Sequence, residues 1–597
     1  MYAATKRENM AHSKDRTDVR STLSSSISLL KTYLKPQWLK VSLLAFLLCV
    51  SIGLEILGPQ LLGQFINAIQ GSMQILVRLA LLFIALVIGN QLVTALASYI
   101  SEDISWQATN EMRVDLVLHC LNLDMSFHKL HTPGELLERV DGDIAQLANF
   151  FSRFIFMVLA RVVLMIGIVT LTIIADWRIG LLMLAFTLLM IILLHPLQSI
   201  AVPHFRAARQ ASADLASFLE ERLSSREDIC SLGAQPYVML RFNQVARHLL
   251  HATRLSSVTG QFFSSSIEII LAMAVAAILT LGAYLLRSGQ LSLGTIYATY
   301  AYTTLLTQSL YVITYQVDQL QSALASLQRL TELFRTSSAI VEGPGVPLPA
   351  GALPVSFADV SFGYTAEKPV LRNISFELPA GKTLGLLGRT GSGKTTLARL
   401  LMRAYEVQQG AIRLGGRDLR EAALNELRSR IGVVTQDVQL FHASLRDNLT
   451  FFDSAIPDER LKEVIAELNL AQWYASLPAG LDTLLTGGGV SLSSGEAQLL
   501  AFARVFLRNP DIVILDEASS RLDPLTEKLI EGAIARLLAG RTGIVIAHHL
   551  ETVQHVDTIL ILEDGTIGEY GERAKLAADP ASRFSQLLQT GLSEVIV

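Results

Sequence analysis

The chain has 597 residues, of which 51% are hydrophobic and 17% charged, and its mean hydropathy is +0.42. A soluble protein rarely has so apolar an average, so part of the chain is expected to lie in lipid. The net charge of −4 argues against general binding to nucleic acid. Three cysteines, Cys49, Cys120 and Cys230, have no metal-ligand spacing, and we expect them to be buried apolar residues.

The N-terminal segment is polar and charged over residues 1–24, which predicts a mobile cytoplasmic tail. Residues 26–36 follow with the pattern of a short amphipathic helix that ends at Pro36. Such a helix can lie along the membrane interface before the first span.

Six apolar segments exceed the roughly 20 residues that a helix needs to cross a bilayer. They are residues 41–63, 76–100, 150–174, 177–198, 264–286 and 293–315. Two further segments, 101–149 and 199–263, are long, helical in pattern and rich in charge. We therefore predict an all-α domain of six spans over residues 25–330, with two long cytoplasmic arms.

Positive charges indicate the direction of the spans. Lys31, Lys35 and Lys40 precede the first span, and segment 199–263 is rich in arginine, whereas the loop 58–74 has neither lysine nor arginine. By the positive-inside rule, the N-terminus and both arms are cytoplasmic. Six spans then return the chain to the cytoplasm.

Ionisable residues inside spans are costly and usually face a cavity. Glu55, Arg161 and Glu268 are therefore candidates for a substrate cavity, with Asn90 and Gln91 as polar companions. The alternative is that charges near a span end reach the interface, or that Arg161 pairs with a neighbouring acid. The mixed signs of these charges do not name a substrate.

A Pro/Gly-rich stretch from Val341 marks a linker, because neither a helix nor a central strand tolerates it. We place this linker at residues 331–352, a globular α/β domain at 353–590 and a short tail at 591–597.

The strongest motif in the chain is Gly388-Arg-Thr-Gly-Ser-Gly-Lys-Thr395, which lies between a strand-like run from Thr383 and a helical run from Thr396. Glycines let backbone amides converge on phosphate oxygens, and the following helix N-terminus adds positive potential. Lys394 is expected to reach the β- and γ-phosphates and Thr395 to bind Mg²⁺. The remaining nucleotide-binding positions of the motif are Gly388, Thr390, Gly391, Ser392, Gly393 and Thr396.

A second motif is the apolar strand 512–515 followed by Asp516 and Glu517. Asp516 can hold Mg²⁺ through water, and Glu517 can orient the attacking water for in-line displacement. Together with the phosphate loop, this strand indicates a P-loop nucleotide hydrolase.

Further residues stand in a recognisable order around these two motifs: Tyr364, Gln436, Leu492-Ser-Ser-Gly-Glu496, Ser520-Arg-Leu-Asp523 and His548. The ordered set resembles the ATP-binding cassette of ABC transporters. The membrane half is similar to the six-helix exporter-type domain of the same family, so the resemblance runs from about residue 25 to about 590. The stretch from Leu123 resembles the first cytoplasmic arm of that family, and the stretch from Leu232 resembles the coupling region of the second arm.

The resemblance implies a role for each matching residue. Tyr364 stacks on adenine, Gln436 touches Mg²⁺ and His548 contacts the γ-phosphate as part of the catalytic set. Ser493, Gly495 and Glu496 belong to the signature, in which Ser493 and Gly495 face the γ-phosphate of ATP held by a second cassette. The implied cofactors are ATP and Mg²⁺, with Thr395, Gln436 and Asp516 as the metal-binding residues.

Departures from the family pattern lie on surfaces that serve a partner. Ser494 replaces the third residue of the usual signature, Gly487 stands where exporters usually carry a glutamate, and Arg521 replaces a small residue. We infer a heterodimer with a second ABC half-transporter that lacks the catalytic glutamate, so that one composite ATP site hydrolyses rapidly. The alternative is a homodimer.

These features predict a helical membrane domain followed by an α/β P-loop cassette, in an exporter-type half-transporter driven by ATP hydrolysis. The expected substrate is a drug, a lipid or a peptide-like molecule, and the expected location is a bacterial inner membrane with the cassette in the cytoplasm. Two alternatives stay open: an importer built on the same fold, and a non-transporting channel or regulatory subunit.

Overall fold

The structure is a computed structural model that describes residues 31–150, 156–365, 368–435, 438–485, 492–516, 524–547 and 553–589. The chain divides into two compact units. The first comprises Met1–Leu121 and Pro133–Thr336, and the second comprises Asn122–Thr132 and Ser337–Val597. Segment Asn122–Thr132, from the first predicted arm, thus belongs to the same unit as the cassette.

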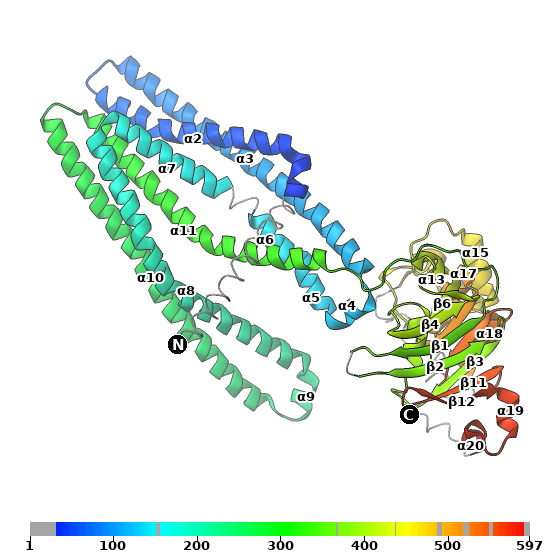
Figure 1. Ribbon diagram of the computed structural model, residues 1–597. Helices are drawn as coiled ribbons and strands as arrows, with labels where there is room; N and C mark the ends of the chain where they lie inside the picture. The colour runs from blue at the N-terminus through cyan, green and yellow to red at the C-terminus, as the bar shows by residue number, and fades with distance from the viewer. Residues whose placement is uncertain are drawn as a thin grey trace, which may run out of the picture. The chain divides into compact units, whose positions relative to one another are not determined.

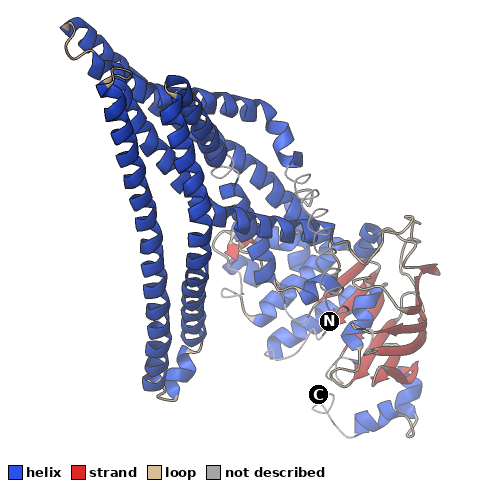
Figure 2. Ribbon diagram, turned by 60° about the vertical axis from the view of Figure 1, so that its left-hand side comes forward, coloured by secondary structure: helices blue, strands red, loops and turns tan. Residues whose placement is uncertain are grey.

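The described part of the first unit is helical, as Figure 2 shows by its colour. Each predicted span lies within one long helix, except that only the later part of the third span lies in α7. The helices are α2 (Trp38–Asn67), α3 (Met73–Asn122), α7 (Phe156–Ala175), α8 (Trp177–Ser224), α10 (Gln235–Arg287) and α11 (Leu293–Arg335). Within the described ranges, four helices are long and apolar enough to cross a membrane: Lys31–Asn67, Met73–Asn122, Met157–Ala175 and Gln235–Arg287. In α8 the apolar stretch found is the shorter Trp177–Leu193.

Side-chain caps and small residues explain where these helices begin and how closely two of them pack. Asp176 caps α8 by accepting hydrogen bonds from the amides of Arg178 and Ile179. Helices α2 and α11 approach so closely that a Cβ on Gly294 would lie 1.9 Å from the carbonyl oxygen of Gly63. Only glycine fits there, as is common where membrane helices cross.

The arms continue the membrane helices. The first arm has short segments beyond α3: α4 (Met125–Leu130), α5 (Pro133–Leu137), a π-helical stretch (Glu138–Asp143) and α6 (Ile144–Asn149). In the second arm, α8 and α10 run side by side and are joined through α9 (Arg226–Ser231), as Figure 1 shows. The prediction of two long helical arms is confirmed.

A buried carboxylate joins the first arm to α11 within the first unit. Asp143 is 2% exposed and accepts hydrogen bonds from Ser326 Oγ at 2.9 Å and from Arg329 Nε at 3.0 Å, both on α11. Arg139 also donates to it at 3.3 Å. Burial alone would raise the pKa of Asp143, but the hydrogen bonds from Arg329 and Ser326 outweigh it and hold that pKa below its usual range.

The second unit contains the strands. A six-stranded sheet has the order β12-β11-β3-β10-β9-β6, in which only the β11–β12 pair is antiparallel. Its strands are β3 (Thr383–Gly388), β6 (Ile431–Val434), β9 (Ile512–Asp516), β10 (Thr542–Ile546), β11 (Thr558–Glu563) and β12 (Thr566–Glu572). A four-stranded antiparallel sheet, in the order β2-β1-β4-β5, consists of β1 (Val355–Phe362), β2 (Leu371–Leu378), β4 (Gln409–Leu414) and β5 (Arg417–Asp418). The short strands β7 (Ala443–Ser444) and β8 (Leu484–Leu485) pair with each other.

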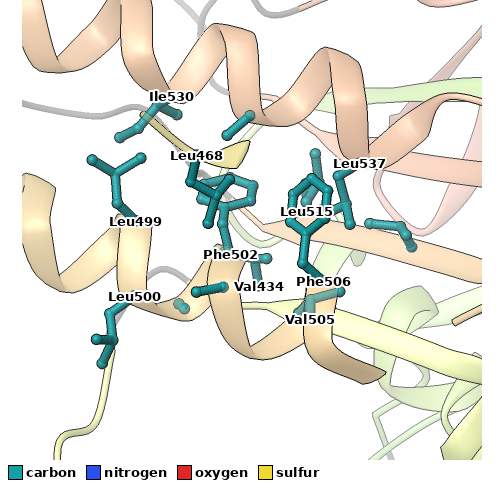
Figure 3. Close-up of a cluster of buried hydrophobic side chains, with 14 of the residues drawn as sticks. Val434, Leu468, Leu499, Leu500, Phe502, Val505, Phe506, Leu515, Ile530 and Leu537 are labelled. Carbon is teal, nitrogen blue, oxygen red and sulfur yellow. The ribbon is translucent and has the colours of Figure 1, made fainter. Parts of the chain in front are cut away.

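Helices pack around these sheets: α12 (Lys394–Leu401), α13 (Leu424–Arg430), α14 (Leu445–Thr450), α15 (Asp458–Glu467), α16 (Ala471–Ser476), α17 (Ser494–Arg508), α18 (Pro524–Leu538), α19 (Arg573–Ala578) and α20 (Arg583–Gln589). Figure 3 shows the core beside the six-stranded sheet, where Phe502 and Phe506 of α17 lie near Leu515 of β9 and Leu537 of α18. The helical membrane domain followed by an α/β cassette is therefore as predicted.

Two smaller predictions need correction. Of the three cysteines, Cys120 is buried, whereas Cys49 on α2 and Cys230 on α9 are exposed, so two of them do not belong to a core. The α-helical turn before the first span stops at Leu34, and a 3₁₀ turn (Lys35–Gln37) carries the chain through Pro36 directly into α2. Residues 1–30 and 590–597, which include the predicted tails, lie outside the described residues.

Candidate nucleotide site

The phosphate-loop motif forms a tight turn between β3 and α12. Gly388, Gly391 and Gly393 have φ values of 148°, 84° and 109°, which side-chain-bearing residues rarely adopt. A Cβ on Gly388 would also lie 2.4 Å from the carbonyl oxygen of Leu562. The glycines are thus required by the backbone of the loop, and the loop leads into the N-terminus of α12, where amide groups favour an anion.

Lys394 lies at the start of α12 and is 5% exposed. Its Nζ donates to the carbonyl oxygens of Gly388 at 2.5 Å and Arg389 at 3.2 Å, so the ammonium group is held over the loop. The hydroxyl of Ser392 is buried and has no hydrogen-bond partner among the described residues. A buried cation and an unpaired hydroxyl in one glycine-rich turn fit a bound polyphosphate.

Tyr364 lies close to the same turn. Its hydroxyl is 3.1 Å from Thr396 Oγ1 and accepts a hydrogen bond from Arg399 Nη1 at 3.3 Å, which ties the ring to α12. A cavity of about 320 Å³ joins the tyrosine to the loop. It is lined by Tyr364, Val370, Arg389, Thr390, Gly391, Gly393, Lys394, Thr395 and Thr396. The structure therefore brings the predicted adenine and phosphate contacts to one cavity.

The parallel strands bring Asp516 to the same edge of the sheet. Ile546 of β10 pairs with Leu386 of β3 on one side and with Asp516 of β9 on the other. Because the carboxyl ends of parallel strands share an edge, Asp516 and the phosphate loop lie at that edge. Gln436, Glu517 and His548 come shortly after β6, β9 and β10 in the chain, but they lie outside the described residues.

The signature residues form the start of α17. Ser493 is the N-cap, and its hydroxyl accepts from the Glu496 amide at 3.2 Å while Glu496 Oε2 accepts from the Ser493 amide at 2.7 Å. This reciprocal pair is a capping box, which the spacing Ser-x-x-Glu could have predicted. Gly495 is buried and Ser493 is exposed. Gly487 and Arg521, two of the predicted departures, lie outside the described residues.

Sequence reasoning missed Arg504, on the inner face of α17. Arg504 is 8% exposed, and its guanidinium donates to the carbonyl oxygens of Asn448 at 2.7 Å and Gln439 at 2.9 Å. Burial lowers its pKa to about 10. The sequence signal that could have identified this residue was an arginine within the apolar face of a helix. Arg504 links the signature helix to the segment just after Gln436.

A second cavity, of about 340 Å³, lies between α2, α3 and α7 in the first unit. Glu55 and Arg161 both line it, and Arg161 Nη1 donates to Glu55 Oε1 at 2.8 Å. Asn90 and Gln91 line it as well. The structure thus brings two of the three predicted substrate residues together as an ion pair, whereas Glu268 is exposed on α10 and does not line this cavity.

Comparison with known proteins gives matches over both units. Residues 41–310 match the family model for the ABC transporter transmembrane region, and residues 371–520 match the ABC transporter model. The chain is 31% identical to the ATP-dependent lipid A-core flippase of Photorhabdus laumondii, over 85% of this chain and 87% of that protein. It is 30% identical to the protein of the same name in Salmonella typhimurium, over 82% and 85%.

Among solved structures, the fold matches that of a bacterial Atm1-family ABC exporter with ATP bound, with a TM-score of 0.79. The match covers 93% of this chain and 98% of that chain at 23% identity. At this identity the likeness concerns the fold.

Proposed function

The chain belongs to the ABC transporter family and is an ATP-hydrolysing transporter with its membrane and ATP-binding regions in one polypeptide, and we propose that it exports an amphipathic substrate as one half of an unequal dimer. The observation that carries the ATP role is the cavity shared by Tyr364 and the phosphate loop, with Asp516 at the same sheet edge.

The residues present fit ATP and Mg²⁺. Lys394, released from the carbonyls it now contacts, would pair with the β- and γ-phosphates, and Tyr364 would stack on the base. Thr395, Asp516 and Gln436 would hold Mg²⁺, which supplies positive charge against the phosphates when bound. By the family resemblance, Glu517 would orient and polarise the attacking water, and His548 would contact the γ-phosphate.

The dimer is supported by the signature. Ser493 is exposed at the N-terminus of α17, where a helix end can face an anion held by another cassette. Ser494 adds a side chain where the family usually has none, and Gly487 stands where the family usually has a glutamate. By the family resemblance, both positions serve a partner. Intact ATP-holding residues and an altered signature are what the hydrolytic half of a heterodimer would carry.

The amphipathic substrate class is supported by the cavity between α2, α3 and α7. Polar lining groups, including Ser51, Asn90 and the Glu55–Arg161 pair, lie beside apolar ones such as Leu48 and Leu164. Relatives named as lipid A-core flippases point to the same class of substrate. A polar headgroup with an apolar tail fits such a lining. Glu268 is not part of the proposed substrate site.

The orientation proposed for the chain places the N-terminus and the cassette in the cytoplasm of a bacterium, with the spans in its inner membrane. Lysines before α2 and arginines in the second arm support this orientation. Export is then movement away from the ATP-bearing side.

The central test is a comparison of the wild-type chain with Glu517→Gln, each purified alone and each together with any half-transporter that a neighbouring reading frame encodes. Glu517→Gln should bind ATP normally and lose turnover, because the carboxylate acts mainly in the transition state. Retained turnover would remove Glu517 from its role. Brisk substrate-coupled hydrolysis by the chain alone would exclude the heterodimer.

Direction is tested in inverted membrane vesicles with a fluorescent lipid. ATP-dependent accumulation inside the vesicles supports export, and ATP-dependent loss supports the importer alternative. ATPase activity that no lipid or drug stimulates would favour a regulatory or channel subunit.

A further inference from the structure

A lysine from the first cytoplasmic arm lies over the tyrosine of the candidate adenine site. The Nζ of Lys129, in the last turn of α4, is 3.5 Å from the centroid of the Tyr364 ring. Both residues belong to the second unit. A cation at this distance over an aromatic face is attracted by the ring quadrupole.

The position of α4 is set by a buried carboxylate at its first turn. Asp124 is 8% exposed and caps the helix by accepting from the Ser126 amide at 3.0 Å. Its second oxygen accepts from the amide of Ala339 at 3.0 Å, in the connection between α11 and β1. Asp124 therefore ties α4 to the chain of the cassette unit, and Lys129 lies five residues further on.

The Tyr364 ring is itself held by the cassette. Its hydroxyl contacts Thr396 and Arg399, and the rings of Phe362 and Tyr405 pack on it at interplanar angles of 83° and 82°. The ring is therefore fixed in orientation. Lys129 is exposed at the surface and has a long flexible stem, so it can move at little cost.

Adenine and Lys129 would compete for the same space. A base stacked on this face would have its atoms about 3.5–4 Å from the ring carbons, which is where the ammonium lies. We propose that Lys129 covers the adenine-binding face of Tyr364, so that ATP binds only when the first arm releases this lysine. While the arm is docked, Lys129 lowers the affinity of the site for ATP. When ATP binds, it displaces Lys129 and thereby acts on the arm through this one side chain.

This inference rests on the proposed role of Tyr364 in stacking on adenine. The test measures equilibrium binding of ATP to the purified full-length chain in nanodiscs, without Mg²⁺ so that ATP is not consumed. Lys129→Met keeps the stem length and removes the charge, and it should tighten ATP binding about two- to five-fold. Lys129→Arg keeps a cation over the ring and should bind ATP as the wild type does.

Two comparisons separate competition from a general charge effect. Inorganic tripolyphosphate has no base, so its affinity should be the same for Lys129→Met and the wild type. Lys462→Met removes an exposed lysine from α15 and is the matched control, with no change expected for either ligand.

Three results would overturn the proposal: unchanged ATP binding in Lys129→Met, weaker binding of ATP, or a parallel change for ATP and tripolyphosphate. Tyr364→Ala identifies which idea has failed. If Tyr364→Ala leaves ATP affinity intact, the adenine role of Tyr364 is wrong. If it weakens ATP binding but Lys129→Met changes nothing, only the competition is wrong.

Discussion

Arg161 on α7 donates a 2.8 Å hydrogen bond to Glu55 on α2, so two opposite charges from different spans meet in one cavity. The side chains are 31% and 26% exposed, and the pair is therefore neither fully buried nor freely solvated. Removing one partner leaves the other charge without compensation in an apolar setting. The pair accordingly supports both the packing of α2 on α7 and the polarity of the cavity.

Arg161→Gln and Glu55→Gln should each lower stability by about 1 kcal/mol, below the value for a fully buried pair because both groups keep some solvent contact. The double variant should lose less than the sum of the two, because neither charge is then left alone. Thermal melting in detergent measures this coupling. Arg287→Gln, an exposed position at the end of α10, is the matched control. Strictly additive losses would show that the pair is not coupled.

Asp143 is expected to make stability depend on pH. Since its folded-state pKa is lowered from the ordinary value of about 3.9, its contribution is present above that value and is lost as the pH falls through the folded pKa. Asp143→Asn should cost about 1–2 kcal/mol at pH 7, less than for a fully buried pair because the Arg329 side chain is 40% exposed.

Melting temperatures of Asp143→Asn and the wild type, compared from pH 7 to pH 3, measure this linkage. The gap between the two proteins should stay constant down to about pH 5 and narrow below about pH 4. A gap that widens in acid would contradict the ionised, hydrogen-bonded carboxylate.

The capping box at α17 predicts different results for two changes at one position. Glu496→Ala removes the acceptor for the Ser493 amide and should destabilise the cassette by about 0.5–1 kcal/mol. Glu496→Gln keeps an oxygen at the same place and should be nearly neutral. Denaturant unfolding of the full chain, followed by tryptophan fluorescence, compares them. Equal losses would show that charge, and not the cap, is what matters.

Tyr364 is predicted to bind the base through its ring. Tyr364→Ala should weaken ATP binding roughly 5- to 150-fold, as expected for loss of one stacking contact of about 1–3 kcal/mol. Tyr364→Phe keeps the ring and loses only the hydroxyl contacts with Thr396 and Arg399, so a change of about twofold is expected. Titration with a fluorescent ATP analogue measures both. Similar losses in the two variants would assign the effect to the hydroxyl.

Much of the site could be predicted because its signals are local. The strand from Thr383, the glycines of the loop and the helix from Lys394 follow one another in the chain, and each is dictated by its neighbours. The same holds for the strand that ends at Asp516. The capping box of Ser493 and Glu496 is equally local and was predictable, although only its signature role was expected.

The sequence by itself determined the apolar segments, the clusters of positive charge beside them and the phosphate loop, because hydropathy, helix length and positive φ angles depend on residues close together in the chain. Only the tertiary structure decided that Arg161 meets Glu55, that Glu268 does not join them, and that Lys129 covers Tyr364. Such pairs are separated by many residues, and their contact depends on the register in which helices pack and on where an arm docks. No local pattern encodes that register.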